Sequence, residues 1–503
     1  VKGKVLDEKT KEALIGVSVL EAGSTSNGTV TDLDGNFSLS VPEGATLRIS
    51  YVGYLVQEIP LNGRKSLEVL LKEDTEMLDE VVIVGYGVQK KATLSGSVTS
   101  IGGEKLANTP VTNVSQGLAG RLPGVVAISN TAEPGYDGAT IRIRGVNTFG
   151  KADPLVVVDG VPGRSLERID PSTIETMSVM KDASAAIYGA QAANGVIIIT
   201  TKRGKKGKPT VNLSYNYGIS RPSVIPEMAN ASEYATLLNE IDKYAGNKER
   251  YTPEDIQKYR DGSDPWSYPN TDWFKETLKP WSPQTYANAT IDGGTDNMTY
   301  FVSVSAKTQD GFYRNSGTKY NQYDLKSNLD LKLNKYINLF MNLTGRMEDR
   351  KYPTRSSENI FRMLMRSKPN MPAYWPNGLP GPDIEFGDNP VVIATDATGY
   401  ERDKRYILNG DFGVNINVPY VEGLTLKATA SLDKNFRFRK IWQTPWTLYS
   451  WDGTSMDENN NPLLVEGKKG FSDPRLRESM EDNQNILLSG IINYNRTFAE
   501  NHS

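Results

Sequence analysis

Strict alternation of apolar and polar residues over long stretches is the feature that most constrains this chain. Successive side chains of a β-strand point to opposite faces, so each alternating segment predicts a strand with one apolar and one polar face. Two weaker segments cover about 285–293 and 484–496. The clearer segments are 211–219, 298–306, 323–333, 337–344, 406–416 and 424–433. We therefore predict a mainly β protein with roughly eight antiparallel strands after residue 203.

The predicted strands and their connections favour a membrane barrel. Lengths of about 9–14 residues are long for a soluble sheet and suit a tilted crossing of a bilayer. Short turns alternate with long loops, as in outer-membrane barrels, although a soluble β-solenoid or a large sandwich also alternates. The short turns, which we expect at the periplasmic side, are 294–296, 334–336 and 419–423. The long connections lie near 220–284, 308–319, 348–404 and 436–483.

Composition excludes several functional classes. The 503 residues include no cysteine and a single histidine, His502. Disulfides, thiolate metal sites and cysteine nucleophiles are thereby excluded, and histidine-based triads or zinc hydrolases are disfavoured. Lys and Arg number 57 against 60 Asp and Glu, so no basic excess points to nucleic acid. We expect no catalytic residue, no metal and no cofactor. A glycan hydrolase would need two carboxylates that the sequence cannot place.

Residues 1–75 consist of short β runs separated by turns, which predicts a small sandwich of about seven strands. Asp34-Gly35 between alternating segments predicts a hairpin turn. Asp32 and Asp34 suggest a calcium loop, but the longer ligand series and distal glutamate of an EF-hand are missing. We therefore interpret this segment as a plain turn.

A different pattern begins near residue 79. Gly85 and Gly87 follow a predicted strand, but Lys90 stands where a dinucleotide-binding motif needs its third glycine. The β-branched run 81–84, led by two acids, is a good extended segment. Such a segment adds readily to the sheet edge of another protein. It is equally consistent with the first buried strand of the next domain.

The segment 92–203 combines strands and short helices. Strands are predicted at 141–145, 154–158 and 196–201, a capped helical start at Asp170-Pro171, and a short helix over 181–189. In order, its sequence blocks resemble the plug domain of the SusC/RagA family of TonB-dependent transporters. The blocks are 94–98, 120–125, 141–145, 158–162, 181–189 and 193–204. The preceding run 79–91 resembles that family's Ton box region, and the N-terminal sandwich resembles the carboxypeptidase-regulatory-like domain, which carries no peptidase activity.

The resemblance implies a domain plan. A β-sandwich spans 1–75, a Ton box segment 76–91, an α+β plug 92–203, and the first strands of a transmembrane antiparallel β-barrel 204–503. The family's barrels have 22 strands, whereas about eight are predicted here. A closed eight-stranded barrel is filled by its own side chains and has no room for a plug. We therefore expect the chain to be the N-terminal half of a longer protein.

The resemblance also implies a function. The expected activity is TonB-dependent import of an oligosaccharide or a peptide across the outer membrane of a Gram-negative bacterium. The expected partners are a SusD-like surface lipoprotein that acts as a lid, TonB with its inner-membrane energising complex, and outer-membrane lipid. The N-terminal domain and the Ton box would lie in the periplasm. The alternative is a siderophore receptor or a TonB-dependent signal transducer without such a lid.

Three groups of residues are candidates for these roles. Arg142 and Arg144 are candidate contacts of the plug with the barrel wall, although an internal ion pair is equally consistent. Aromatic faces stack on sugars or peptides, so tryptophans of the long loops are candidate ligand contacts. The alternative interpretations are packing within the loops and an interfacial aromatic belt. These tryptophans are Trp266, Trp273, Trp375, Trp446 and Trp451. The expected TonB-binding residues are Asp79, Glu80, Val81, Val82, Ile83, Val84, Gly85 and Tyr86.

Overall fold

The computed structural model describes most of the chain in two compact units. The described residues are 1–8, 10–22, 27–42, 44–51, 54–72, 81–84, 87–90, 98–107, 113–129, 131, 133–143, 145, 152–181 and 183–496. One unit comprises Val1–Val98 with Met180–Ala190, and the other Thr99–Val179 with Gln191–Ser503. Among the described residues, no helix has the length and apolar character needed to cross a membrane.

The N-terminal unit contains the predicted small sandwich. Seven short strands form a three-stranded sheet, β4-β1-β7, and a four-stranded sheet, β3-β2-β5-β6. Alternate residues of both sheets, such as Val5, Val19, Ile49 and Val69, are buried in one core. The strands are β1(Lys2–Asp7), β2(Ser18–Glu21), β3(Gly28–Val30), β4(Asn36–Ser38), β5(Thr46–Ser50), β6(Gln57–Pro60) and β7(Ser66–Leu71).

The turn at Asp34-Gly35 is not a hairpin, so that prediction is wrong. The Asp32 carboxylate accepts hydrogen bonds from the backbone N–H groups of Asp34 at 3.0 Å and Asn36 at 2.8 Å. These bonds turn the chain, but β3 before the turn and β4 after it belong to different sheets. The turn therefore carries the chain across the sandwich, because hydrophobic burial on both sheets overrides the local hairpin preference.

The plug segment, residues 99–203, is an α+β structure in which the five-stranded sheet has the order β10-β15-β16-β13-β14. Ile141, Val158, Ile174 and Ile197 contribute to its core. A second sheet pairs β11 with β12. The strands are β10(Val98–Gly102), β11(Val125–Ser129), β12(Ala139–Ile143), β13(Leu155–Val158), β14(Val161–Pro162), β15(Ile174–Met180) and β16(Val196–Thr201).

The helical parts of this segment are short. The helix α2(Gly103–Ala107) is joined by 3-10 turns at η2(Gln116–Leu118), η3(Pro171–Thr173) and η4(Ala183–Ala192). The predicted cap is confirmed, since the Asp170 side chain accepts a hydrogen bond from the N–H of Ser172 at 2.9 Å. The helix predicted over 181–189 is instead 3-10 and is interrupted at Gly189, whose φ is 72°.

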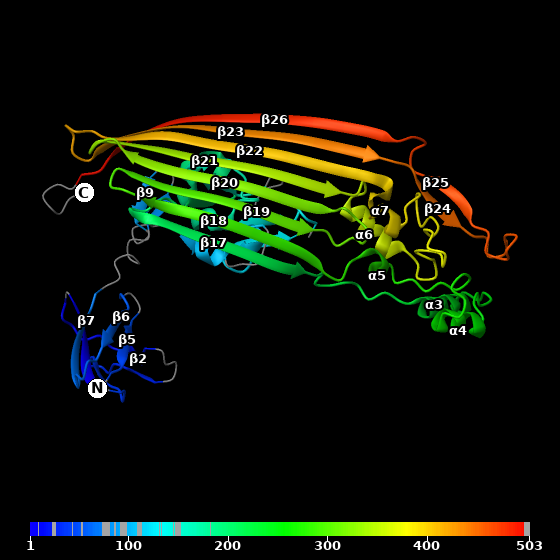
Figure 1. Ribbon diagram of the computed structural model, residues 1–503, viewed down its shortest axis with the longest axis horizontal. Coiled ribbons are helices and arrows are strands. Elements are labelled where there is room, and N and C mark those ends of the chain that lie inside the picture. Colours follow the sequence, from blue (N-terminus) through cyan, green and yellow to red (C-terminus); the bar gives the residue numbers. More distant parts are fainter. Residues whose placement is uncertain are drawn as a thin grey trace. The chain divides into compact units, whose positions relative to one another are not determined.

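Eight long strands form one antiparallel sheet, here called the wall, in which neighbours in sequence are neighbours in space (Figure 1). The eight predicted strands are thus confirmed, with lengths of 13 to 20 residues. They are β17(Gly207–Ser220), β18(Ser282–Gly294), β19(Met298–Asp310), β20(Lys319–Lys332), β21(Ile337–Tyr352), β22(Gly399–Asn417), β23(Leu424–Gln443) and β26(Arg475–Tyr494).

Several wall strands are longer than the alternation predicts, because charged residues replace apolar ones toward the long-loop ends. There, Arg402 pairs with Asp349 at 2.7 Å across β21 and β22. Arg439 pairs with Glu401 at 2.6 Å across β22 and β23. Cross-strand ion pairs stabilise a ladder as apolar pairs do, but they carry no hydrophobic period. The sequence pattern therefore marks only part of each strand.

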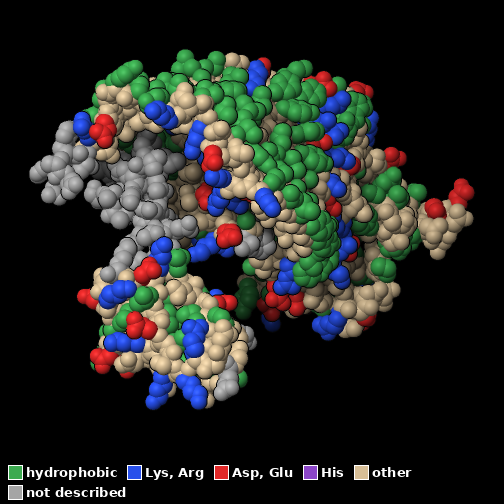
Figure 2. Space-filling view, turned by 60° about the vertical axis from the view of Figure 1, so that its left-hand side comes forward, with side chains coloured by type: hydrophobic (Ala, Val, Ile, Leu, Met, Phe, Trp, Pro, Cys, Tyr) green, Lys and Arg blue, Asp and Glu red, His purple; other side chains and the backbone are tan. Residues whose placement is uncertain are grey.

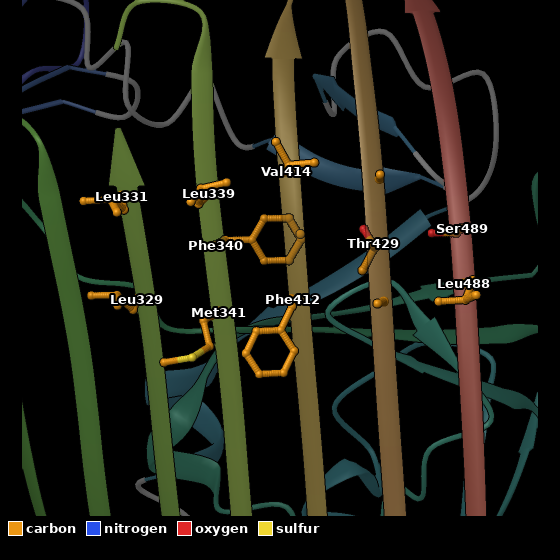
Figure 3. A pocket seen from close by; sticks show the side chains of 13 residues that line it. Leu329, Leu331, Leu339, Phe340, Met341, Phe412, Val414, Thr429, Leu488 and Ser489 are labelled. Atoms are coloured by element: carbon orange, nitrogen blue, oxygen red, sulfur yellow. The ribbon is translucent and has the colours of Figure 1, made fainter. Parts of the chain in front are cut away.

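One face of the wall is apolar and exposed. Leu325, Leu408, Phe412 and Leu488 are between 49% and 76% exposed there, and Figure 2 shows hydrophobic side chains gathered across the sheet. A shallow depression on this face runs over β20–β23 and β26 and is lined by Leu329, Leu339, Met341 and Val414 among others (Figure 3). The opposite face carries polar residues and is packed against the plug segment. An outer lipid face and an inner polar face are what a membrane barrel requires.

The connections at one end of the wall contain helices and a two-stranded sheet, and are here together called the cap (Figure 1). It comprises residues 221–281, 311–318, 353–398 and 444–474. Its core includes Trp273, Phe274, Ile360 and Ile393. The cap elements are α3(Ala231–Tyr244), α4(Pro253–Asp261), α5(Trp273–Thr277), α6(Ser357–Arg366), α7(Pro390–Ile393), η5(Asp396–Thr398), β24(Trp446–Ser450) and β25(Val465–Lys469).

Candidate functional site

The contacts between the plug segment and the wall form a buried charged site. Its first element is the two-residue turn Asp159-Gly160, which joins β13 to β14. Both residues have positive φ, 51° and 87°, as a type I′ turn requires. The tight turn leads the chain back, and residues 163–165 then lie against β22 and β23.

Arg164 is held there by two carboxylates of the wall. Its guanidinium donates to both oxygens of Asp411, at 3.0 and 2.6 Å, and to both oxygens of Asp433, the shortest at 2.7 Å. Only 6% of the Arg164 side chain and 3% of the Asp411 side chain are exposed. Burial alone lowers the pKa of Arg164, but these hydrogen bonds outweigh it and raise the pKa, so the group stays charged.

A second ion pair links the same turn to β20. The Lys326 ammonium lies 3.2 Å from Asp159, and both side chains are buried. Asp159 also accepts hydrogen bonds from the Thr201 N–H at 2.9 Å and from its hydroxyl at 2.8 Å. Burial raises the pKa of Asp159, but Lys326 and Thr201 lower it by more, so the carboxylate is ionised.

The C-terminal end of the plug segment and the residue before η3 are tied to the wall as well. Arg203 pairs with Asp330 at 2.7 Å, immediately before β17 begins. The Tyr286 hydroxyl of β18 donates to Asp170 at 2.6 Å. Asn328 of β20 donates to the backbone carbonyl of Lys202 at 2.6 Å. The plug segment is therefore anchored to the wall at several separate points.

An aromatic cluster surrounds the plug loop at 133–137. Tyr136 packs against Tyr352 of β21 with ring centroids 5.1 Å apart. The Arg350 guanidinium lies 5.0 Å from the Tyr136 ring and 5.5 Å from the Tyr320 ring. A Cβ added to Gly135 would come within 2.7 Å of Tyr320, and this glycine has φ 79°. Only glycine therefore lets the plug loop approach the wall so closely.

Glu133 in this loop is a weaker acid than an ordinary glutamate. Burial raises its pKa from 4.5 to about 7, while a hydrogen bond with Ser357 opposes the shift and the nearby Glu401 adds to it. Ser357 is the first residue of α6 in the cap. Glu133 thus connects the plug segment to the cap through a group that titrates near neutral pH.

The predicted plug arginines occupy different surroundings. Arg142 lies 2.5 Å from Asp153, which is itself in the plug segment and 69% exposed. Arg144 lies outside the described residues. The sequence interpretation missed Arg164, Arg203 and Asp159. The alternation places Asp411 and Asp433 on the polar face of the wall, but nothing local indicates which plug residue meets them.

The predicted aromatic residues all lie in the cap. Three of them form a cluster, in which Trp375 stacks on Trp266 at 5.5 Å and meets Trp451 edge-on at 6.3 Å. Trp273 and Trp446 belong to the cap core. Their indole N–H groups donate to backbone carbonyls, as those of Trp375 and Trp451 also do. This geometry favours a packing role, with Trp266 and Trp451 the half-buried members.

The predicted TonB-binding run is described in part. Val81–Val84 form the strand β8, which pairs antiparallel with β9(Gly87–Lys90). Asp79, Glu80, Gly85 and Tyr86 lie outside the described residues. The extended backbone predicted for 81–84 is present.

Comparisons with known proteins give the site its context. Residues 1–83 match the CarboxypepD_reg-like domain, and residues 90–196 match the TonB-dependent receptor plug domain. The chain is 33% identical over 453 residues to the TonB-dependent receptor SusC of Bacteroides thetaiotaomicron, covering 84% of this chain and 42% of the relative. It is 32% identical over 496 residues to the TonB-dependent receptor P39 of Formosa agariphila, covering 97% of this chain and 44% of the relative.

A solved structure is similar in fold. The RagAB peptide importer in its open-open state matches with a TM-score of 0.60 at 20% identity, covering 82% of this chain and 55% of that chain. The chain spans less than half the length of SusC and P39. The wall described here therefore corresponds to part of these relatives.

Proposed function

Because this chain belongs to the SusC/RagA family of TonB-dependent receptors, which reside in the outer membrane, we propose that it is part of an active importer for oligosaccharides or peptides. The observation that carries the proposal is a folded plug segment held by buried ion pairs against the polar face of a sheet with an exposed apolar opposite face. The relatives are TonB-dependent receptors.

In the proposed mechanism the plug closes the barrel until TonB engages the periplasmic segment 79–86. The plug contacts are polar and ionic, so water can replace them once the plug is displaced. An apolar interface would instead expose hydrophobic surface to water when the plug moves, and this exposure would oppose opening. Pulling on the chain N-terminal to the plug would break these contacts, using energy from the inner membrane, and open a path along the wall.

We further propose a SusD-like lipoprotein as the lid over the cap. The helix α3 supports this partner, because Leu237, Ile241 and Tyr244 are 50%, 57% and 93% exposed along it. Their spacing places them on one face of the helix. Contiguous exposed apolar patches are typical of protein contact sites, so this face of α3 is a candidate surface for the lid. A siderophore receptor or signal transducer without a lid would leave this stripe uncovered.

A proline substitution tests the TonB step. Val82→Pro removes a backbone donor from the segment expected to add to TonB's sheet, and uptake of the nutrient should be lost while the protein still assembles in the outer membrane. Val82→Ala is the matched control, because it shortens the same side chain but keeps the N–H group. Normal uptake by Val82→Pro would reject strand addition at this position.

A further inference from the structure

A cavity of about 790 Å³ lies in the cap, between residues 225–230, which precede α3, the helix α5 and the end of α6. This size is within the usual range for small-ligand sites. Its lining combines apolar and aromatic side chains, such as Met228, Tyr234 and Met365, with charged ones. It is separate from the plug–wall contacts and from the tryptophan cluster of Trp266, Trp375 and Trp451.

The charges around this cavity are unbalanced. The acidic lining residues are Glu227 and Asp272, and the Asp272 carboxylate caps α5 by accepting a hydrogen bond from the N–H of Lys275 at 3.0 Å. The cationic lining residues are Lys275, Lys279, Arg314, Arg366 and Lys368. The whole chain carries a net charge of −3, so this concentration of cations does not reflect its composition.

Several of these cations are available to a ligand. Arg366 already pairs with Glu385 at 2.6 Å. Within the described part of the chain, Lys275, Lys279 and Lys368 have no ion pair within 4.0 Å. Lys275 and Lys368 are exposed and Lys279 is half-buried. Unpaired lysines around a concave surface produce a local positive potential, which attracts anions.

The backbone that carries these lysines is held rigidly. The Trp273 indole donates to the carbonyl of Lys368 at 2.8 Å, and the Thr271 N–H donates to the carbonyl of Pro369 at 2.8 Å. On the other side, Arg314 donates through Nε to the carbonyls of Lys275 at 2.7 Å and Leu278 at 3.0 Å. A site held by such hydrogen bonds loses little conformational entropy when a ligand binds.

We propose that this cavity binds an extended ligand that carries repeated carboxylate or sulfate groups, with its uncharged parts against Tyr234, Met228 and Met365. The inference rests on the proposed import function and names the substrate class that the cap selects. An acidic oligosaccharide and an acidic peptide share this chemistry. A neutral oligosaccharide would leave the three unpaired lysines without anionic partners.

Equilibrium binding to the full-length receptor, purified in mild detergent, tests the proposal. The probes are a tetramer of galacturonic acid, a tetramer of galactose as its neutral counterpart, and a tetraglutamate peptide, each at 50 and 300 mM sodium chloride. We expect at least one anionic probe to bind at least tenfold more tightly than the galactose tetramer at low salt, with this advantage reduced at high salt. Whichever anionic probe binds more tightly identifies the source of the ligand.

Two matched variants show whether the cavity is responsible. Lys275→Gln with Lys368→Gln should weaken binding of the anionic probe about tenfold, because two exposed cations are removed. Lys243→Gln with Lys248→Gln removes the same charge from exposed sites of the cap outside the cavity, and binding should change by less than about twofold. Equal binding of the neutral and anionic probes would overturn the proposal, and so would equal effects of the two double variants.

The binding test does not depend on energised transport. Val82→Pro should bind the anionic probe like the unmodified receptor while losing uptake. If Val82→Pro kept uptake and the lysine variants lost binding, the proposed TonB contact at this position would be rejected and the anion site would stand. If Val82→Pro lost uptake and the lysine variants kept binding, the TonB contact would stand and the anion site would be rejected.

Discussion

Arg164 of the plug segment holds Asp411 of β22 through two parallel hydrogen bonds, 3.0 Å from Nη1 to Oδ2 and 2.6 Å from Nη2 to Oδ1. Bidentate pairs of this kind are stronger and more directional than single charged hydrogen bonds. The pair joins residues 247 positions apart in the chain. Together with Asp433 it forms the most buried charged link between the plug loop after β14 and the wall.

Removing this link should loosen the plug. Arg164→Gln leaves Asp411 buried without its cation, and breaking a buried pair in this way costs about 3–5 kcal/mol. We expect higher single-channel conductance of the full-length protein in planar bilayers and greater entry of large antibiotics into cells.

Arg142→Gln is the control for Arg164→Gln, because its partner Asp153 is 69% exposed and such pairs contribute only about 0–1 kcal/mol. If Arg142→Gln opened the channel as much as Arg164→Gln, the Arg164 contacts would not be the ones that hold the plug.

The packing role of the tryptophan cluster predicts a stability effect. Trp375 is 6% exposed and packs against both Trp266 and Trp451, which also contact each other at 6.0 Å. Trp375→Ala should destabilise the cap by about 3–5 kcal/mol, as truncation of a buried aromatic side chain usually does. Hydrogen exchange in residues 251–275 and 446–470 would measure the loss.

Trp281→Ala is the matched comparison, since Trp281 is 49% exposed and should have little effect. A Trp375→Ala variant with unchanged exchange but lost ligand binding would assign the cluster to ligand contact instead.

Glu133 predicts a dependence of stability on pH. Folding raises its pKa from 4.5 to about 7, so the folded protein binds the proton more tightly than the unfolded chain. This contribution is fully present below pH 4.5, decreases as the pH rises, and is lost above about pH 7. Glu133→Gln should therefore stabilise the protein at pH 8 by about 1–3 kcal/mol and have little effect near pH 4.5.

Thermal unfolding of the full-length protein in detergent at pH 5 and pH 8 would measure this difference. Glu104→Gln, at an exposed position of α2, should leave the pH dependence unchanged. A Glu133→Gln variant with the same pH dependence as the unmodified protein would show that Glu133 does not control it.

The orientation of the wall in lipid predicts that a lysine substitution has different effects on its two faces. Phe412 is 52% exposed on the apolar face of β22 (Figure 3). Phe412→Lys should cost about 2–4 kcal/mol if this position lies near the bilayer midplane, and should reduce the amount of folded protein in the outer membrane. Asn415→Lys places the same charge on the polar face and should be tolerated. Equal folded amounts of the two variants, compared by heat-modifiable migration, would contradict this orientation.

Much of the fold follows from local patterns. The eight wall strands are visible in the sequence because lipid on one side and polar surroundings on the other impose a period of two. The Asp170-Pro171 cap forms as predicted, because its hydrogen bond involves only residues two positions apart. The six sequence blocks that indicate the plug are likewise short, and they follow one another along the chain in the same order as in the family.

The dipeptide Asp-Gly shows where local information stops. At 159–160 it forms a true hairpin between β13 and β14. At 34–35 it turns the chain between two different sheets. The residues in the turn are the same, so the burial of the flanking strands decides the outcome.

By itself, the sequence determined the family, the mainly β class, the strands of the wall and the face that each of their residues occupies, because these depend on neighbours along the chain. Only the tertiary structure decided that Arg164, rather than Arg142, meets the wall, that three distant tryptophans form one cluster, and that the lysines near 275 and 368 line one cavity. The reason is physical. An ion pair or a cavity depends on distances between residues that lie tens to hundreds of positions apart, and no local period of the sequence records those distances.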